Sequence, residues 1–208
     1  MGQRIGVVLA GGQGRRYGRT KGDLVLEGRT LAERAASALW PLCGSVVISI
    51  RPGMRHPAPM YPAVEDRVLD RGPLAGLDAV FASTGDADLL VLACDYPGVG
   101  AGELSALLAA ARDGDDLVLW TDPAGRDHPL VALWRRTAAP AVAEAVIEGA
   151  LRVRAVLAAL EVRRLRPVDH PGLDLVKALR NVNHPDDFPA LGDSQGLRRR
   201  GTVDREPR

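Results

Sequence analysis

Four short apolar runs, separated by longer segments with helical spacing, constrain the fold of this chain most strongly. The runs are nearly continuous in Val, Ile and Leu, which is typical of strands covered on both faces of a sheet. They span residues 4–10, 45–50, 88–94 and 116–120. Apolar residues recur every three to four positions in the intervening segments 30–42, 73–84 and 102–113. This alternation predicts an α/β fold with three α/β/α layers around a mostly parallel, Rossmann-like sheet.

The second half of the chain is less regular. Its expected elements are a strand over 129–136, helices over 137–149 and 151–160, a strand near 161–167, and a turn with a helix start over 181–188. With 208 residues, of which 46% are hydrophobic, the chain can bury one sizeable core, so we expect a single domain over 1–191. Residues 192–208 carry Gly, Arg and Asp with little apolar content, which predicts a disordered basic tail.

Charge and cysteine content narrow the class of protein. Lys and Arg together number 27 against 26 Asp and Glu, which argues against a nucleic-acid or membrane-surface partner. Cys43 and Cys94 match no metal-binding spacing and lie in apolar surroundings, as reduced thiols usually do. The first residues lack the pattern of a secretory signal, and no apolar run is long enough to span a membrane. We therefore expect a cytoplasmic protein.

A glycine-rich, basic stretch, LAGGQGRRYGRTK at 9–21, follows the first predicted strand. Open α/β sheets bind ligands at the carboxyl ends of their strands, where glycine N–H groups and basic side chains can hold phosphate oxygens. The stretch lacks the Gly-Lys-Ser/Thr of a P-loop, and its glycines run GxGxxxG instead of the dinucleotide-binding GxGxxG. Two interpretations stay open at this point: a polyphosphate cradle, and a solvated glycine-rich turn.

Further motifs accompany this stretch along the chain. They are VED (64–66), GPLAG (72–76), CDYP (94–97), GRDHPLVAL (125–133), LRVR (151–154) and NVNHPDD (181–187). Together with LAGGxxxRxGxxK, they resemble the signature of nucleotidyltransferases with a glycosyltransferase-like α/β fold, and within these the molybdenum cofactor guanylyltransferase family. The resemblance implies an Mg²⁺-dependent enzyme that transfers GMP from GTP to the terminal phosphate of molybdopterin and releases pyrophosphate.

Two alternatives to this activity stay open. A cytidylyltransferase, or another nucleotidyltransferase with a different phosphorylated acceptor, would share most motifs, although this chain has LAGG where the cytidylyltransferases resemble LAAG. A regulator or carrier that keeps only the nucleotide pocket would be expected to lack Lys21 or Asp95, and both are present. The sequence does not say which partner receives the product, although hand-off to molybdoenzymes or their chaperones would be sensible.

The resemblance assigns roles to individual residues. Asp95 is expected to hold Mg²⁺, which prefers oxygen ligands. The alternative is a structural role, in which Asp95 caps the next helix or turn. Arg16 and Lys21 are expected to be catalytic, because cations stabilise charge that develops on the triphosphate. The expected nucleotide contacts are Leu9, Ala10, Gly11, Gly12, Lys21, Ser49, Asp66, Pro73, Leu74 and Asp95. Ser49 stands where the family often has Asn, and whether Asp66 contacts the base or the ribose stays open.

A separate group of residues is expected to bind the acceptor. Its members are His128, Arg152, Arg154, Asn181 and Asn183. Arginines suit a phosphate group, and asparagines suit the amide-like edge of a pterin. Ordinary structural roles stay open for all of them: a hydrogen-bonded turn for the histidine, a solvated helix face for the arginines, and turns for the asparagines.

Overall fold

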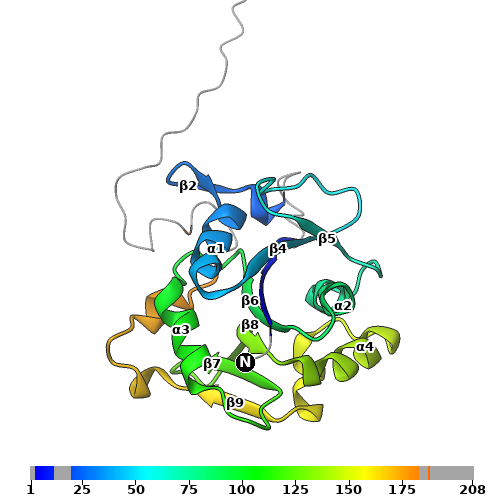
Figure 1. Cartoon of the computed structure of the whole chain (residues 1–208). Helices are drawn as coiled ribbons and strands as arrows, with labels where there is room; N and C mark the ends of the chain where they lie inside the picture. The colour runs from blue at the N-terminus through cyan, green and yellow to red at the C-terminus, as the bar shows by residue number, and fades with distance from the viewer. Residues whose placement is uncertain (1–2, 12–19, 183–186, 188–208) are drawn as a thin grey trace, which may run out of the picture.

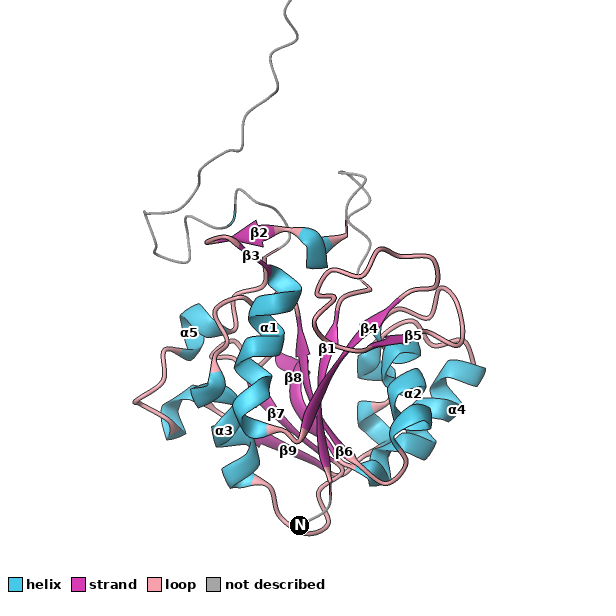
Figure 2. Ribbon diagram, turned by 45° about the horizontal axis from the view of Figure 1, so that its top comes forward, coloured by secondary structure: helices cyan, strands magenta, loops and turns pink. Residues whose placement is uncertain are grey.

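The computed structural model describes residues 3–11, 20–182 and 187, and it contains a seven-stranded sheet with helices on both faces (Figure 1). The strands of this sheet are β1 (Arg4–Leu9), β4 (Ser45–Ile50), β5 (Ala63–Glu65), β6 (Asp88–Ala93), β7 (Leu117–Thr121), β8 (Asp127–Trp134) and β9 (Val162–Leu165). The helices are α1 (Leu31–Leu39), α2 (Pro73–Thr84), α3 (Ala101–Ala110), α4 (Ala139–Ile147) and α5 (Leu175–Ala178). Figure 2 shows α1 and α3 on one face of the sheet and α2 and α4 on the other.

The strand order is β5-β4-β1-β6-β8-β7-β9, so β1 and β6 lie side by side near the middle. β1 pairs in parallel with both β4 and β6, whereas β8 runs antiparallel to its two neighbours. The carboxyl ends of β1, β4, β6, β7 and β9 therefore share one edge of the sheet with the start of β8. We call this the carboxyl edge. The predicted mostly parallel α/β sheet is confirmed.

Both faces of the sheet are buried, and this explains the continuous apolar runs of the strands. Along β1, Val8 packs into the cluster formed with α1 and α3, while Val7 and Leu9 pack into the cluster formed with α2 and α4. Trp120 and Trp134 are fully buried, one in each cluster. The sheet thus separates two cores, and its carboxyl edge is left for polar residues.

Local signals fix where the first helices begin and end. Thr30 Oγ1 accepts a hydrogen bond from the Glu33 N–H at 3.1 Å, and Glu33 Oε2 accepts one from the Thr30 N–H at 2.9 Å, so α1 starts with a capping box. Pro73 is in the first turn of α2, where the missing N–H of proline leaves no hydrogen bond unmade. Gly85 follows α2 with a φ of 62°, a conformation that favours glycine.

The structure differs from the sequence expectation in several segments. The helix expected over 151–160 is wrong: this segment forms two 3₁₀ turns, Val153–Ala155 and Leu157–Ala159, because only Val153 and Val156 are buried and no continuous apolar stripe exists. The helix expected over 102–113 ends early, at Ala110. The strands and α-helices that were not predicted are β2 (Val25–Leu26), β3 (Arg29–Thr30), β5 and α5. Most of the turn at 181–188 and the whole tail at 192–208 lie outside the described residues.

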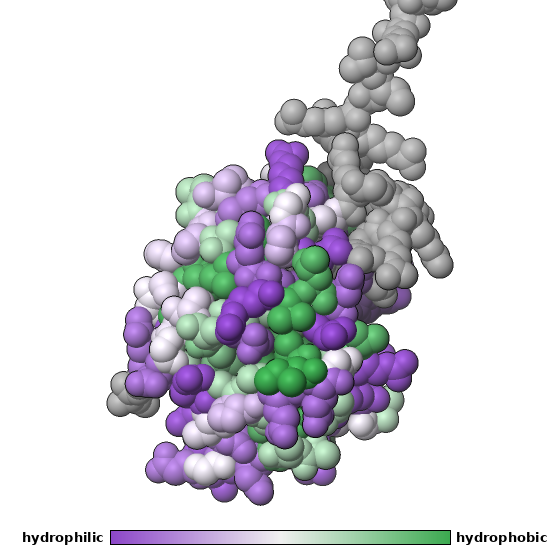
Figure 3. Space-filling model, turned by 90° about the vertical axis from the view of Figure 1, so that its right-hand side faces the viewer, coloured by the Kyte–Doolittle hydropathy of each residue, from purple (hydrophilic) through white to green (hydrophobic). Residues whose placement is uncertain are grey.

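Two surface properties complete the description. Within the described ranges, no helix is both long and apolar enough to cross a membrane. Figure 3 shows apolar side chains gathered on the face that α2 and α4 cover, among hydrophilic ones. The last residue of α4, Ile147, is 84% exposed.

Candidate functional site

Two charged side chains meet at the carboxyl edge, beside β1 and β6. Asp95 follows β6, and Lys21 opens a short 3₁₀ helix, Lys21–Asp23. Lys21 Nζ lies 3.1 Å from Asp95 Oδ2, and the exposed fractions of the two side chains are 19% and 16%. These residues are 74 positions apart in the sequence. The adjacency of β1 and β6 brings them together, because segments that leave neighbouring parallel strands emerge at the same edge.

The turn that carries Lys21 is packed directly against the end of β1. Gly22 is buried, and a Cβ added to it would lie 3.2 Å from both Ala10 Cβ and Pro57 Cγ. Thr20 Oγ1 donates to Asp23 Oδ2 at 2.7 Å, which ties the ends of this turn together. The missing side chain of Gly22 thus allows the backbone of the lysine to approach the sheet.

Asn181 is in direct contact with Asp95. Its Nδ2 donates to Asp95 Oδ2 at 2.9 Å, and the N–H of Val182 donates to the main-chain oxygen of Asp95 at 2.8 Å. The Oδ1 atoms of Asp95 and Asn181 are buried, and neither has a hydrogen-bond partner among the described residues. Buried polar atoms are normally paired, and two unpaired oxygens are suitable ligands for a divalent cation.

A second carboxylate, Asp66, lies where β4 and β5 end. Its N–H donates to the Ile50 oxygen at 2.9 Å, and Ser49 Oγ donates to its Oδ1 at 3.3 Å. The Ser49 side chain is only 2% exposed, so its hydroxyl supports Asp66 from inside the protein. Gly76 on α2 leaves the space for this pair, since a Cβ there would collide with Ser49 Oγ and lie 3.4 Å from Asp66 Oδ1.

The electrostatic surroundings of Asp66 differ from those of a solvated carboxylate. Burial raises the pKa of Asp66 to about 6, although the hydrogen bond from Ser49 and the charge of Arg51 act in the opposite direction. Arg51 follows β4, and its Cγ would lie 3.3 Å from a Cβ added to Gly11. Its Nε is buried and unpaired within the described part of the chain. Sequence reasoning missed Arg51, whose place directly after a predicted strand was the available signal.

Three of the expected nucleotide contacts have buried side chains. Leu9, Ala10 and Leu74 are 7%, 0% and 0% exposed, so none of these side chains is open to a nucleotide in this structure. Pro73 begins α2 directly after Gly72, whose φ is 57°. A Cβ added to Gly72 would lie 2.9 Å from the Leu151 oxygen, and the segment that contains the acceptor arginines therefore begins beside the start of α2.

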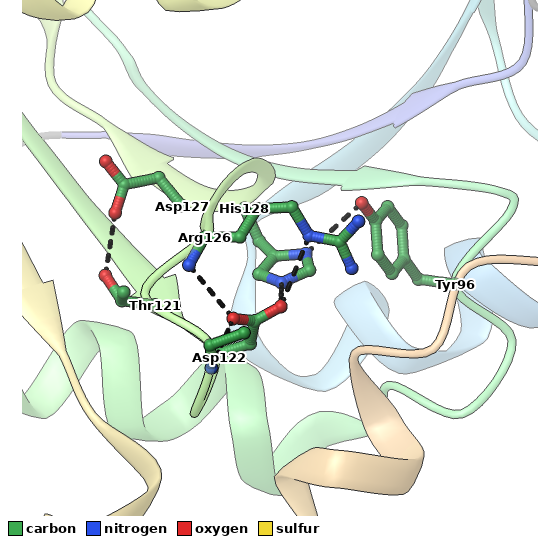
Figure 4. A network of polar contacts seen from close by, with 7 residues as sticks. Tyr96, Thr121, Asp122, Arg126, Asp127 and His128 are labelled. Atoms are coloured by element: carbon green, nitrogen blue, oxygen red, sulfur yellow. Dashed lines mark hydrogen bonds and ion pairs between the residues drawn. The ribbon is translucent and has the colours of Figure 1, made fainter.

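His128 is buried, with 2% of its surface exposed, at the start of β8. Its Nδ1 lies 3.3 Å from Tyr96 Oη and its Nε2 lies 3.2 Å from Asp122 Oδ2 (Figure 4). Both ring nitrogens are therefore engaged within the protein. This geometry supports the interpretation of His128 as a hydrogen-bonded structural residue more strongly than direct contact with an acceptor.

Arg152 and Arg154 are both exposed, in and beside the turn Val153–Ala155. The segment is a 3₁₀ turn and not the α-helix expected, but the solvated position considered as their structural alternative agrees with this exposure. Arg154 contributes to an open pocket of about 390 Å³. The other residues that line it are Gly125, Asp127, Leu157, Ala158 and Arg164. Arg164 is ion-paired with Asp127 in this lining, so binding of an anionic group here would depend mainly on Arg154.

Comparison with known proteins decides the family. The model of the MobA-like NTP transferase domain matches residues 6–168. The chain belongs to the MobA-like NTP transferase family. The "Probable molybdenum cofactor guanylyltransferase" of Mycobacterium marinum is 33% identical over 192 residues, which are 89% of this chain and 91% of the relative. The protein of the same name from Chloroflexus aggregans is 32% identical over 196 residues, 88% of this chain and 90% of that one.

Solved structures agree with this family. The molybdopterin-guanine dinucleotide biosynthesis protein A of Archaeoglobus fulgidus has a TM-score of 0.74 at 25% identity, and the match covers 90% of this chain and 96% of that one. A 2-C-methyl-D-erythritol 4-phosphate cytidylyltransferase from Thermus thermophilus has a TM-score of 0.66 at 18% identity, over 91% and 97% of the two chains, which shows a shared fold. The MobA-like chain is accordingly a nucleotidyltransferase, as the motifs predicted.

Some expected site residues of this MobA-like protein are not placed by the structure. Arg16, Gly12 and Asn183 lie outside the described residues. Within the described part of the chain, no group of three or more His, Cys, Asp or Glu side chains could hold a metal ion. A cation at this site would therefore rely on one carboxylate, on other oxygen donors and on the substrate, which is the usual arrangement for Mg²⁺ at phosphate sites.

Proposed function

We propose that the protein transfers GMP from GTP to the terminal phosphate of molybdopterin and releases pyrophosphate. The observation that carries the proposal is the pairing of Lys21 with Asp95 at the carboxyl edge of a MobA-like domain. The names of the curated relatives support the choice of guanine and of the acceptor. The product, a dinucleotide form of the cofactor, would then pass to molybdoenzymes or their chaperones.

Each part of the reaction has a candidate group in this chain. An oxygen of the acceptor phosphate forms a bond to the α-phosphorus of GTP, and the bond from that phosphorus to the bridging oxygen of pyrophosphate breaks. Because the attacking phosphate is already an anion, no general base is needed. Lys21 is placed to neutralise charge on the triphosphate, and Asp95 would hold Mg²⁺, which supplies Lewis-acid stabilisation of the same charge.

Thermal unfolding with each nucleoside triphosphate tests the proposed substrate. A ligand that binds only the folded state raises its apparent stability, so GTP with Mg²⁺ should raise the unfolding temperature more than CTP, ATP or UTP. Pyrophosphate release with GTP, Mg²⁺ and molybdopterin tests the reaction itself. A preference for CTP would favour a cytidylyltransferase, and tight GTP binding without turnover would favour a carrier.

We further propose that Asp66 recognises the guanine base. Guanine carries adjacent N1–H and N2–H₂ donors, which one carboxylate can accept together. ITP lacks the N2 amino group, so it should bind at least about tenfold more weakly than GTP, since a hydrogen bond to a charged group contributes roughly 1.5–3 kcal/mol. The measurement is calorimetric titration of both nucleotides. If Asp66 contacts the ribose instead, 2′-deoxyGTP or 3′-deoxyGTP will show the deficit and ITP will not.

The same carboxylate predicts a pH dependence of GTP affinity. Only ionised Asp66 can accept both guanine donors, and its pKa is raised to about 6 by burial. Affinity should therefore be constant above pH 7 and fall as the pH decreases through 6. Calorimetric titrations at several pH values between 5 and 8 measure this, and an affinity independent of pH in this range would contradict it.

Asp66→Asn is the matched control for both titrations, because it keeps the shape and removes the titration. Because burial raises the pKa of Asp66, its protonated form stabilises the folded protein at low pH. This contribution to the free energy of unfolding is lost as the pH rises through 6. The variant should thus bind GTP weakly at every pH and unfold at a higher temperature than the wild type at pH 7.5. This advantage should shrink at pH 5.

A further inference from the structure

A chain of hydrogen-bonded polar side chains, centred on the buried His128, lies next to the Lys21–Asp95 pair. Tyr96 is the residue after Asp95, and its Oη lies 3.3 Å from His128 Nδ1. His128 Nε2 lies 3.2 Å from Asp122 Oδ2 (Figure 4). The rings of Tyr96 and His128 also pack edge to face, with centroids 5.7 Å apart. Three elements are joined in this way: the turn after β6, the end of β7 and the start of β8.

The direction of each hydrogen bond follows from the chemistry of Asp122. Its carboxylate accepts from the N–H groups of Ala124 and Arg126 at 3.0 and 2.9 Å, and from Arg126 Nε at 3.2 Å. Burial alone would raise the pKa of Asp122, but these hydrogen bonds and that of His128 hold it below its usual value. An ionised carboxylate only accepts, so His128 Nε2 carries the proton.

The remaining bonds are then determined. Burial lowers the pKa of His128, so its ring is neutral and Nδ1, without a proton, must accept. The Tyr96 hydroxyl therefore donates to His128, and its oxygen can only accept from other groups. Asn181 is such a neighbour, because its side chain is hydrogen-bonded to Tyr96.

This arrangement fixes the orientation of the Asn181 amide. Its nitrogen donates to Asp95 Oδ2 at 2.9 Å and is also the group that Tyr96 can accept from. The amide oxygen must therefore point elsewhere. That oxygen and Asp95 Oδ1 are the two buried side-chain oxygens at the site that find no partner among the described residues.

We propose that Asn181 Oδ1 is a second protein oxygen ligand for the divalent cation that Asp95 binds, and that the chain Tyr96–His128–Asp122 keeps the Asn181 amide in the orientation that presents it. The inference rests on the proposed function, which requires a cation at Asp95. It moves Asn181 from the acceptor side to the cation site and makes His128 a positioning residue. Mg²⁺ and Mn²⁺ both accept amide and carboxylate oxygens as ligands.

Mn²⁺ binding, followed by the electron paramagnetic resonance signal of free Mn²⁺, tests the inference without turnover. Asn181→Ala should weaken Mn²⁺ binding about tenfold, in the range seen when a residue that supports a metal site is lost. Asn181→Asp keeps an oxygen at the same place and adds charge, so it should bind Mn²⁺ at least as tightly as the wild type. Tyr96→Phe removes only the hydroxyl and should weaken binding less than Asn181→Ala does.

Each result that contradicts the inference would show which part of it is wrong. If Asn181→Ala binds Mn²⁺ like the wild type while the KM for molybdopterin rises, Asn181 belongs to the acceptor site and the inference is overturned. Unchanged Mn²⁺ affinity in Tyr96→Phe would overturn the role of the polar chain. Asp95→Ala serves as the reference variant. If it still binds Mn²⁺ like the wild type, Asp95 does not hold the cation and the proposed site is wrong. Nucleotide preference, measured separately by thermal protection, tests the proposed function independently of all these variants.

Discussion

Asp95→Ala is expected to lower the rate of pyrophosphate release about a thousandfold, as measured with GTP, Mg²⁺ and the acceptor at saturation. Stabilisation of transition-state charge by a bound cation contributes several kcal/mol, and each 1.36 kcal/mol corresponds to a factor of ten. GTP binding should weaken only moderately, because Lys21 and the main chain at the end of β1 remain. Asp95→Asn keeps one oxygen but loses the charge, so it should also be impaired and partly rescued by raised Mg²⁺.

The loss should not come from unfolding. Asp95 contacts Lys21 and Asn181 at the carboxyl edge and is not part of either apolar cluster. Asp169→Ala is a suitable control, since it removes another carboxylate, in an exposed ion pair with Arg166 at 3.2 Å, and should leave turnover unchanged. Normal turnover in Asp95→Ala would make the metal assignment wrong. Global unfolding of that variant would favour a structural role for Asp95.

Gly76→Ala is expected to lower the unfolding temperature by roughly 5 °C and to weaken GTP binding. In a helix interior, alanine is ordinarily the better residue by up to about 1 kcal/mol. Here the added Cβ would collide with Ser49 Oγ and lie 3.1 Å from Leu9 Cδ2. Overpacking of this kind costs about 1–3 kcal/mol, which exceeds the gain in helix propensity. Displacement of Ser49 would also move the carboxylate of Asp66, to which it is hydrogen-bonded.

Gly102→Ala in α3 is the matched control for this prediction. A Cβ there would meet only Leu173 Cδ2 at 3.4 Å, an ordinary contact with the end of a flexible side chain. This variant should therefore keep or slightly raise the unfolding temperature, because alanine reduces the freedom of the unfolded chain. Equal effects of the two substitutions in thermal unfolding would show that the contact between α2 and Ser49 does not limit stability.

The order of strands and helices in the first half was predictable because its signals are local. Each central strand is buried on both faces and therefore consists of one apolar run, as in β1 and β6. The second half was predicted less well for a physical reason: in 151–160 only two side chains are buried, so composition rich in Ala and Leu suggested a helix that has no apolar surface to cover. Short pairs such as β2 and β3 carry too few residues for any periodic signal.

The candidate site also contains residues that could be placed from the sequence and residues that could not. Lys21 and Asp95 could be placed at one site from the sequence, because both follow strands that the fold makes parallel neighbours. The contact of Asn181 with Asp95 could not be predicted in this way. Asn181 is 86 positions from Asp95 and lies in a segment that forms neither helix nor strand. The buried position of His128 was equally hidden. It depends on β8 running antiparallel, which no single run of residues specifies.

The antiparallel direction of β8 also has an evolutionary consequence. Because β7 ends and β8 begins at the carboxyl edge, the five residues between them, Asp122–Arg126, form one hairpin loop whose Gly125 lines the pocket shared with Arg154. The same loop carries Asp122, whose carboxylate accepts a hydrogen bond from the buried His128. One short, contiguous segment therefore contributes both to this pocket and to the hydrogen bonds of His128, so we expect exchange of the loop between relatives to change both together.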